Sequence, residues 1–153
     1  MKRVALGILK LDHFDANLSL PKYHSSEAAG ADIAACLGVG NKLILKPGEK
    51  ALIPTGLIFE IPQGFEIQVR PRSGISFKTG IYLPNSPGTI DSDYRGELKI
   101  LVGNLSDKDE VINHGDRLAQ LIVAPVIQAD FYFVDTISNT TRGEASFGST
   151  GIN

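Results

Sequence analysis

A short turn in the middle of the chain carries two carboxylates and an aromatic ring. Asp91, Asp93 and Tyr94 lie in the stretch PNSPGTIDSDYRGE, between apolar runs at residues 81–83 and 98–102. Proline and glycine punctuate the connection, which is typical of a hairpin loop. If residues 90–94 were extended, the two carboxylates would share one face, an unfavourable placement unless cations or water separate them. An isolated Asp-x-Asp is usually a solvated turn, so neighbouring motifs must decide whether this one performs chemistry.

A second group of chemically useful side chains lies near the end of the chain. Arg142 and Phe147 stand in a background of Ser, Thr and Gly after residue 134. Such a segment cannot bury enough surface to fold alone, and polar termini commonly fray. A cation, a ring and small hydrogen-bonding residues together favour an arm that orders over a ligand. The glycines at 143 and 148 have the spacing of a phosphate-binding P-loop, but its lysine and following helix are missing.

The composition limits the possible partners. The 153 residues, 42% of them apolar, fit one domain, and a net charge of −2 provides no basic field for nucleic acid. Cys36 cannot form an internal disulfide and is predicted to pack in the core. Lys10 and Asp12 interrupt the N-terminal apolar run before a signal peptide could form, so we interpret this run as a first strand. With no apolar window of about 18 residues, we expect a cytoplasmic protein that binds neither nucleic acid nor membrane.

Short apolar runs separated by turn residues must position these side chains. Sixteen Gly and eight Pro leave little room for long helices, so the pattern predicts an all-β sandwich or barrel. One helix of one or two turns is predicted from Ser73 to Lys78, with Ser73 as its cap. Strands are predicted at residues 42–45, 51–53, 57–61, 65–69, 98–102, 118–123 and 131–134.

Five segments of the chain now stand out together. They are Ala29-Gly30-Ala31-Asp32-Ile33, Arg70-Pro71-Arg72-Ser73-Gly74-Ile75, Gly88 to Glu97, Gly115-Asp116-Arg117-Leu118-Ala119-Gln120, and Arg142-Gly143 through Phe147-Gly148-Ser149-Thr150-Gly151. Their order and spacing resemble the five motifs of the trimeric all-β deoxyuridine triphosphatases, the dUTPases. The resemblance implies a distorted jelly-roll or β-barrel with one very short helix. It places a catalytic domain at residues 1–136 and a flexible C-terminal arm, closing over an active site, at residues 137–153.

The resemblance also implies an activity, a metal and an assembly. Members of the family use Mg²⁺ to hydrolyse dUTP to dUMP and pyrophosphate by attack of water on the α-phosphate, which limits uracil in DNA and supplies dUMP for thymidylate synthesis. Asp91 matches the general base, and Asp32 matches an acid that contacts Mg²⁺ only through a bound water. A homotrimer with shared active sites is expected. The residues that match substrate-binding positions are Arg72, Ser73, Gly74, Asn85, Gly88, Thr89, Ile90, Tyr94, Lys99, Gln120, Arg142, Phe147, Gly148 and Ser149.

Within this set, each residue type suits the role that the resemblance implies. Tyr94 offers a flat ring against the deoxyribose that leaves no space for a 2′-hydroxyl. Asn85 matches a side chain that helps to read uracil, and Phe147 a ring that closes over it. Arginine suits phosphate because its planar fork binds two oxygens while staying charged.

The sequence departs from the family in one place and leaves two other functions open. Ala145 and Ser146 stand where the family commonly has two glycines, which puts the closed path of the arm in question. Arg117 is interpreted as structural, paired with an acid across a subunit contact. A dCTP deaminase would need a glutamate where Leu101 stands, and a non-catalytic, nucleotide-responsive interaction protein would need no base at Asp91.

Overall fold

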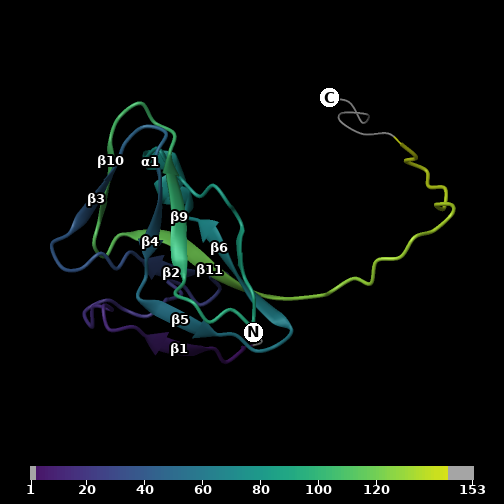
Figure 1. Cartoon of the computed structure of the whole chain (residues 1–153), viewed down its shortest axis with the longest axis horizontal. Helices are drawn as coiled ribbons and strands as arrows, with labels where there is room; N and C mark the ends of the chain where they lie inside the picture. The colour runs from purple at the N-terminus through teal and green to yellow at the C-terminus, as the bar shows by residue number, and fades with distance from the viewer. Residues whose placement is uncertain (1–2, 145–153) are drawn as a thin grey trace.

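The computed structural model describes residues 3–144 and contains short strands with one short helix in that range (Figure 1). The elements are β1 (Gly7–Lys10), β2 (Ala31–Ala34), β3 (Lys42–Leu45), β4 (Lys50–Pro54), β5 (Leu57–Glu60), β6 (Phe65–Pro71), α1 (Ser73–Lys78), β7 (Ile81–Tyr82), β8 (Gly88–Ile90), β9 (Lys99–Asn104), β10 (Glu110–Asn113) and β11 (Arg117–Pro125). The prediction of an all-β protein with one very short helix is confirmed.

The strands form four antiparallel sheets that wrap around one core. The larger sheets have the strand orders β2-β11-β6-β8 and β4-β9-β7, and the pairs β1-β5 and β10-β3 complete the body. In Figure 1 the β1-β5 pair lies along the bottom of the body and the β3-β10 pair at its upper left. Neighbouring strands are mostly far apart in sequence, as in a jelly roll, and every sheet except the β1-β5 pair joins residues from both halves of the chain.

Alternating side chains of these strands fill the core. In β2 and β10, every second residue is buried, which is the period of a strand with one solvated face. Ile53, Ile67 and Ile100 have no exposed surface, and each comes from a different strand. Cys36 is also buried, as predicted, and its Sγ lies 3.3 Å from the main-chain oxygen of His13.

The short helix has the predicted bounds but not the predicted cap. The N-cap is Arg72, whose backbone is extended at φ −96° and ψ 131°, and no side chain caps the helix. Ser73 already lies within the first turn, so the prediction that it caps the helix is wrong. Strand β6 runs to Pro71 and keeps Arg72 extended, which moves the cap position one residue earlier.

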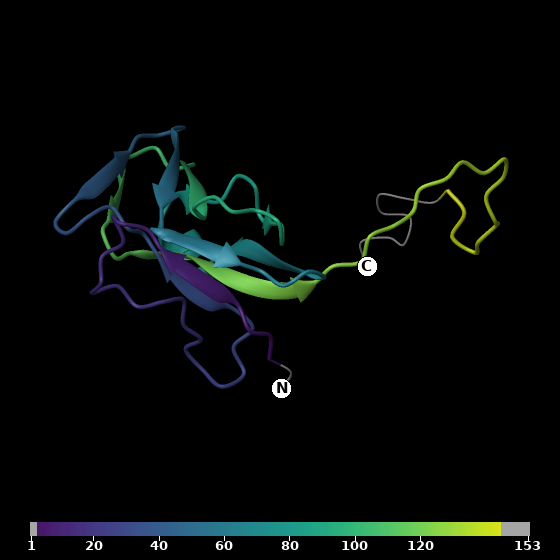
Figure 2. The same ribbon diagram turned by 60° about the horizontal axis from the view of Figure 1, so that its bottom comes forward.

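The chain leaves the body after β11. Both views show the following segment running away from the strands (Figure 2). The strand predicted at residues 131–134 is absent from the structure: Phe131, Tyr132 and Phe133 are almost fully exposed. A strand needs a neighbour for its backbone groups, and residues 3–144 of a single chain offer none at this position. The domain boundary between residues 136 and 137 stays a prediction.

The N-terminal run forms a strand, as expected, over Gly7–Lys10, where β1 pairs with β5. Among residues 3–144, no helix has the length and apolar character needed to cross a bilayer.

Candidate active site

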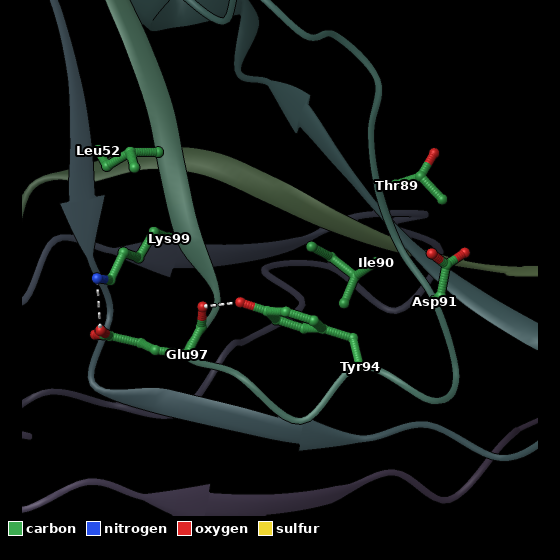
Figure 3. A pocket seen from close by; sticks show the side chains of 7 residues that line it. All are labelled: Leu52, Thr89, Ile90, Asp91, Tyr94, Glu97 and Lys99. Atoms are coloured by element: carbon green, nitrogen blue, oxygen red, sulfur yellow. Dashed lines mark hydrogen bonds and ion pairs between the residues drawn. The ribbon is translucent and has the colours of Figure 1, made fainter.

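The acidic turn opens into a cavity of about 450 Å³. Its lining comes from β4, β8, the turn after β8 and the start of β9 (Figure 3), and consists of Leu52, Thr89, Ile90, Asp91, Tyr94, Glu97 and Lys99. Figure 3 shows the Tyr94 ring between Asp91 on one side and Glu97 with Lys99 on the other. A carboxylate, a flat ring and an ammonium group therefore face one space.

The backbone of the turn determines how Asp91 and Tyr94 are presented. Residues 92–93 form a turn, and the N–H of Tyr94 donates to the carbonyl oxygen of Asp91 at 3.2 Å. The stretch is not extended, so Asp91 and Asp93 do not share a strand face; Asp91 lines the cavity and Asp93 does not.

Two contacts hold the Tyr94 ring in place. Its hydroxyl donates to the main-chain oxygen of Glu97 at 3.1 Å. The ring lies directly over Gly96, where an added Cβ would overlap the tyrosine hydroxyl. Glycine is therefore needed at position 96 for close approach of the ring, not for an unusual backbone angle.

The Glu97 carboxylate connects this cavity to two distant parts of the chain. Its Oε1 accepts the N–H of Gly56 at 2.8 Å and lies 2.9 Å from Nε2 of His13, while Oε2 lies 3.7 Å from Nζ of Lys99. Burial acts to raise the pKa of Glu97, but the Gly56 N–H and the neighbouring His13 and Lys99 hold this pKa below its ordinary value of 4.5. Glu97 is thus an ionised anchor for the ammonium group of Lys99.

A second hollow of about 530 Å³ lies beside the start of α1. It is lined by His24, Ser25, Ala28, Gly30, Asp32, Arg72, Ser73, Gly74, Arg117 and Gln120. None of these residues lines the first cavity. The two hollows of one chain therefore share no lining residue.

Asp32 is the centre of the charges in the second hollow. Its Oδ2 lies 2.9 Å from Nη2 of Arg72, 3.2 Å from Nη1 of Arg117 and 3.4 Å from Nε2 of His24. Arg72 also donates through Nη1 to the main-chain oxygen of Arg117 at 2.7 Å. Two guanidinium groups around one carboxylate leave the cluster with net positive charge, which suits an anionic ligand.

Gln120 closes one wall of this hollow. Its Nε2 donates to the main-chain oxygen of Pro71 at 2.9 Å, and its side chain occupies the space that a Cβ at Gly30 would need. This contact joins the first, second and fourth of the sequence motifs. It follows from the sheet, in which Gln120 of β11 is opposite both Asp32 of β2 and Arg70 of β6.

Comparison with known proteins gives the family of this chain. The family model described as dUTPase matches residues 16–151. The chain belongs to the dUTPase family. It is 52% identical over 146 residues to the deoxyuridine 5′-triphosphate nucleotidohydrolase of Brucella melitensis, covering 95% of this chain and 92% of that protein.

Solved dUTPase structures share the fold. A mutant dUTPase of Staphylococcus bacteriophage 80alpha with dUpNHpp has a TM-score of 0.83 and 28% identity, covering 97% of this chain and 99% of that one. A mutant dUTPase from phage phi11 of S. aureus, described with a coordinated structural Mg(II) ion, has a TM-score of 0.76 and 26% identity and covers 89% of this chain and all of that one.

The structure of this dUTPase-family chain separates the predicted residues into groups. Thr89, Ile90, Asp91, Tyr94 and Lys99 line the first cavity. A second set lines the other hollow, namely Asp32, Arg72, Ser73, Gly74 and Gln120.

The remaining predicted residues lie outside both hollows. The amide of Asn85 lies against Gly88, 2.9 Å from where a Cβ there would be, and neither residue lines a hollow. Arg142 lies on the exposed segment after β11. The positions predicted for Phe147, Gly148 and Ser149, and the departure at Ala145 and Ser146, fall outside the described residues.

Three residues at the two hollows were not predicted to act there. Glu97 and His24 were missed because their partners lie far away in sequence. Arg117 was expected to pair with an acid across a subunit contact; within the described chain its guanidinium pairs with Asp32. Strands β11 and β2 pair side by side and bring the two residues together. Arg117 stands within the fourth sequence motif, and this position could have indicated that it belongs to the site.

Proposed function

We propose that this chain hydrolyses dUTP to dUMP and pyrophosphate, thereby limiting uracil in DNA and supplying dUMP for thymidylate synthesis. The observation that carries the proposal is the single cavity that contains Asp91, Tyr94 and Lys99. Membership of the dUTPase family and the 52% identity to a nucleotidohydrolase support it.

Asp91 acts as the general base in this proposal. Within residues 3–144 its carboxylate makes no side-chain hydrogen bond or ion pair, so both oxygens are available to a water molecule. The water oxygen forms a bond to the α-phosphorus, its proton passes to Asp91, and the bond between the α-phosphorus and the bridging oxygen breaks. Pyrophosphate then leaves with that oxygen, and dUMP remains.

Tyr94 and Asn85 provide selectivity in the proposed reaction. Gly96 and the Glu97 carbonyl oxygen both contact the hydroxyl end of the Tyr94 ring, and a ring oriented in this way can exclude a ribose 2′-hydroxyl sterically. Asn85 and the neighbouring backbone would pair with the uracil edge. Lys99, held by Glu97, provides positive charge on the side of the α-phosphate.

The active site is proposed to combine several chains. The phosphate-binding candidates Arg72 and Gln120 line one hollow and the base Asp91 lines the other, so a complete site needs the first hollow of one subunit to face the second hollow of another. The apolar residues exposed after β11 also need a partner surface, since Phe131, Phe133 and Ile137 are at least 87% exposed. A homotrimer with shared sites satisfies both requirements.

Mg²⁺ is proposed as the cofactor, and the donor set fits an ion held mainly by the triphosphate. Among residues 3–144 no group of three acidic, His or Cys side chains could hold a metal by itself. The three contacts of Asp32 involve Oδ2, which leaves Oδ1 for a metal-bound water. Bound to the triphosphate, Mg²⁺ would neutralise charge on the leaving pyrophosphate. The predicted cytoplasmic location remains part of this proposal.

Pyrophosphate release tests the activity directly. Purified protein with Mg²⁺ is expected to release pyrophosphate from dUTP and to leave dTTP, UTP and dCTP almost unchanged. No release from dUTP, or equal rates with dTTP and UTP, would overturn the proposal. Ammonia release from dCTP would indicate a deaminase instead.

A further inference from the structure

His24 belongs to the hollow that carries the phosphate-binding candidates, although it stands outside the recognised motifs. Lys22 forms two backbone hydrogen bonds with Asp32, at 2.9 and 3.2 Å, and this isolated bridge fixes the start of the loop against β2. Further along the loop, the N–H of Ala28 donates to the main-chain oxygen of Ser25 at 3.3 Å. The backbone therefore places residue 24 beside Asp32 and Arg117.

The ring of His24 contacts Arg117 in a direction that only one form of the ring allows. Nε2 of His24 lies 2.9 Å from Nη1 of Arg117. A guanidinium can only donate, so Nε2 accepts in this contact; the same nitrogen lies 3.4 Å from Oδ2 of Asp32, longer than an ordinary N–H···O hydrogen bond. The same Nη1 lies 3.2 Å from Oδ2 of Asp32. Arg117 is thus held at one nitrogen between a ring and a carboxylate.

This double contact changes what Arg117 can do for a ligand. About half of the Arg117 side chain is exposed, and a free exposed arginine loses considerable rotamer entropy when it binds. An arginine already oriented by its neighbours loses less of this entropy on binding an anion. The remaining N–H groups of Arg117 and Arg72 line the same hollow and can reach phosphate oxygens.

We infer that His24 is a positioning residue for phosphate binding, which acts by accepting a hydrogen bond from Arg117 and so directs this guanidinium at the polyphosphate of the substrate. The inference rests on the proposed function for the identity of the nucleotide. The anion-binding step itself can be measured without turnover.

Binding of inorganic pyrophosphate in the presence of Mg²⁺, measured by calorimetry on the full-length protein, tests the inference. His24→Ala is expected to weaken pyrophosphate binding by about fivefold, as loss of a partly exposed hydrogen bond to a charged group predicts. His24→Gln is expected to bind nearly as well as the unchanged protein, because its amide oxygen can accept from Arg117. Ser26→Ala, in the same loop but outside the hollow, is the matched control.

A double-mutant cycle separates positioning from a general structural effect. If His24 acts through Arg117, His24→Ala should have almost no further effect on pyrophosphate binding when Arg117 is already replaced by glutamine. In the dUTP assay, His24→Ala should raise KM and leave kcat nearly unchanged. Thermal unfolding of each variant shows whether the fold is retained.

Four results would overturn the inference: no pyrophosphate binding by the unchanged protein, equal binding by His24→Ala, equally weak binding by His24→Gln, or additive losses in the double variant. A protein that shows the His24 effect but releases no pyrophosphate from dUTP would contradict the proposed function and leave the positioning role intact.

Discussion

Nη2 of Arg72 lies 2.9 Å from Oδ2 of Asp32, and Nη1 of the same guanidinium donates to the carbonyl oxygen of Arg117 at 2.7 Å. The carboxylate therefore holds the arginine that matches a phosphate-contacting position. A Mg²⁺-bound water and an orderly pair of guanidinium groups would both depend on this one acid.

Replacement of Asp32 by asparagine should lower kcat/KM for dUTP by about 10–100-fold, the range typical for residues that orient ligand-binding groups. The charge that separates Arg72 from Arg117 would be lost. Glu27→Gln removes a carboxylate from the adjacent loop outside the hollow and should retain normal kinetics. Equal kcat/KM in Asp32→Asn and the unchanged protein would show that the acid is dispensable.

Replacement of Asp91 by asparagine should reduce turnover by about 10²–10⁴-fold, because an amide cannot accept the proton of the attacking water. Binding of a non-hydrolysable dUTP analogue should persist, since the shape of the cavity is unchanged. Asp93→Asn, in the same turn but outside the cavity, is the matched control. Full turnover by Asp91→Asn would remove this residue from the mechanism.

Replacement of Gly96 by alanine should displace the Tyr94 ring, because the new methyl group would overlap the tyrosine hydroxyl. We expect the ratio of kcat/KM for dUTP over UTP to fall by about tenfold, which corresponds to about 1.4 kcal/mol of lost discrimination. Tyr94→Phe keeps the ring over Gly96 and loses only the hydrogen bond to Glu97, so its selectivity should stay close to normal. The same loss of selectivity in both variants would contradict the steric explanation.

Stability should fall in acid because two carboxyl groups have a lower pKa in the folded protein. The N–H of Asn17 first, and then His114 at 2.9 Å, lower the pKa of Asp15 from its ordinary 3.8. The pKa of Glu97 is likewise lowered from 4.5, against the effect of burial. The unfolded chain therefore binds these protons first as pH falls, and the stability that both groups contribute above their ordinary pKa values is lost below them.

Urea unfolding at several pH values between about 3 and 7 measures this effect. Glu97→Gln should be less stable near neutral pH and should show a flatter decline in acid. Glu27→Gln serves as the exposed control and should follow the unchanged protein. If the free energy of unfolding fell equally steeply in acid for Glu97→Gln and the unchanged protein, the lowered pKa of Glu97 would be contradicted.

Assembly should depend on the aromatic residues that follow β11. Replacing Phe131 and Phe133 together by aspartate adds two charges where an apolar partner surface is proposed, and should shift the mass in solution from trimer toward monomer. Thr136→Asp adds a charge to the same segment at a polar position and should leave the trimer intact. Analytical ultracentrifugation distinguishes these outcomes, and a stable trimer of the double variant would exclude this segment from the interface.

The sequence alone was sufficient to predict features that depend on residues close together along the chain. Short apolar runs separated by turn residues predicted most of the strands, because strand composition and turn chemistry are local properties of the chain. The helix bounds, Ser73 to Lys78, were correct for the same local reason. The turn at Asp91 and the five ordered motifs were likewise readable, since each is a continuous stretch of chain.

Only the tertiary structure decided which distant groups meet. Glu97 and His13 are 84 residues apart, and Arg117 and His24 are 93 residues apart, so the spacing along the chain predicts neither contact. The apolar run at residues 131–134 has strand composition yet lies exposed, because a strand exists only where a neighbour satisfies its backbone hydrogen bonds. Residue types and periodicity are properties of the chain, whereas ion pairs and sheet neighbours are properties of the folded arrangement.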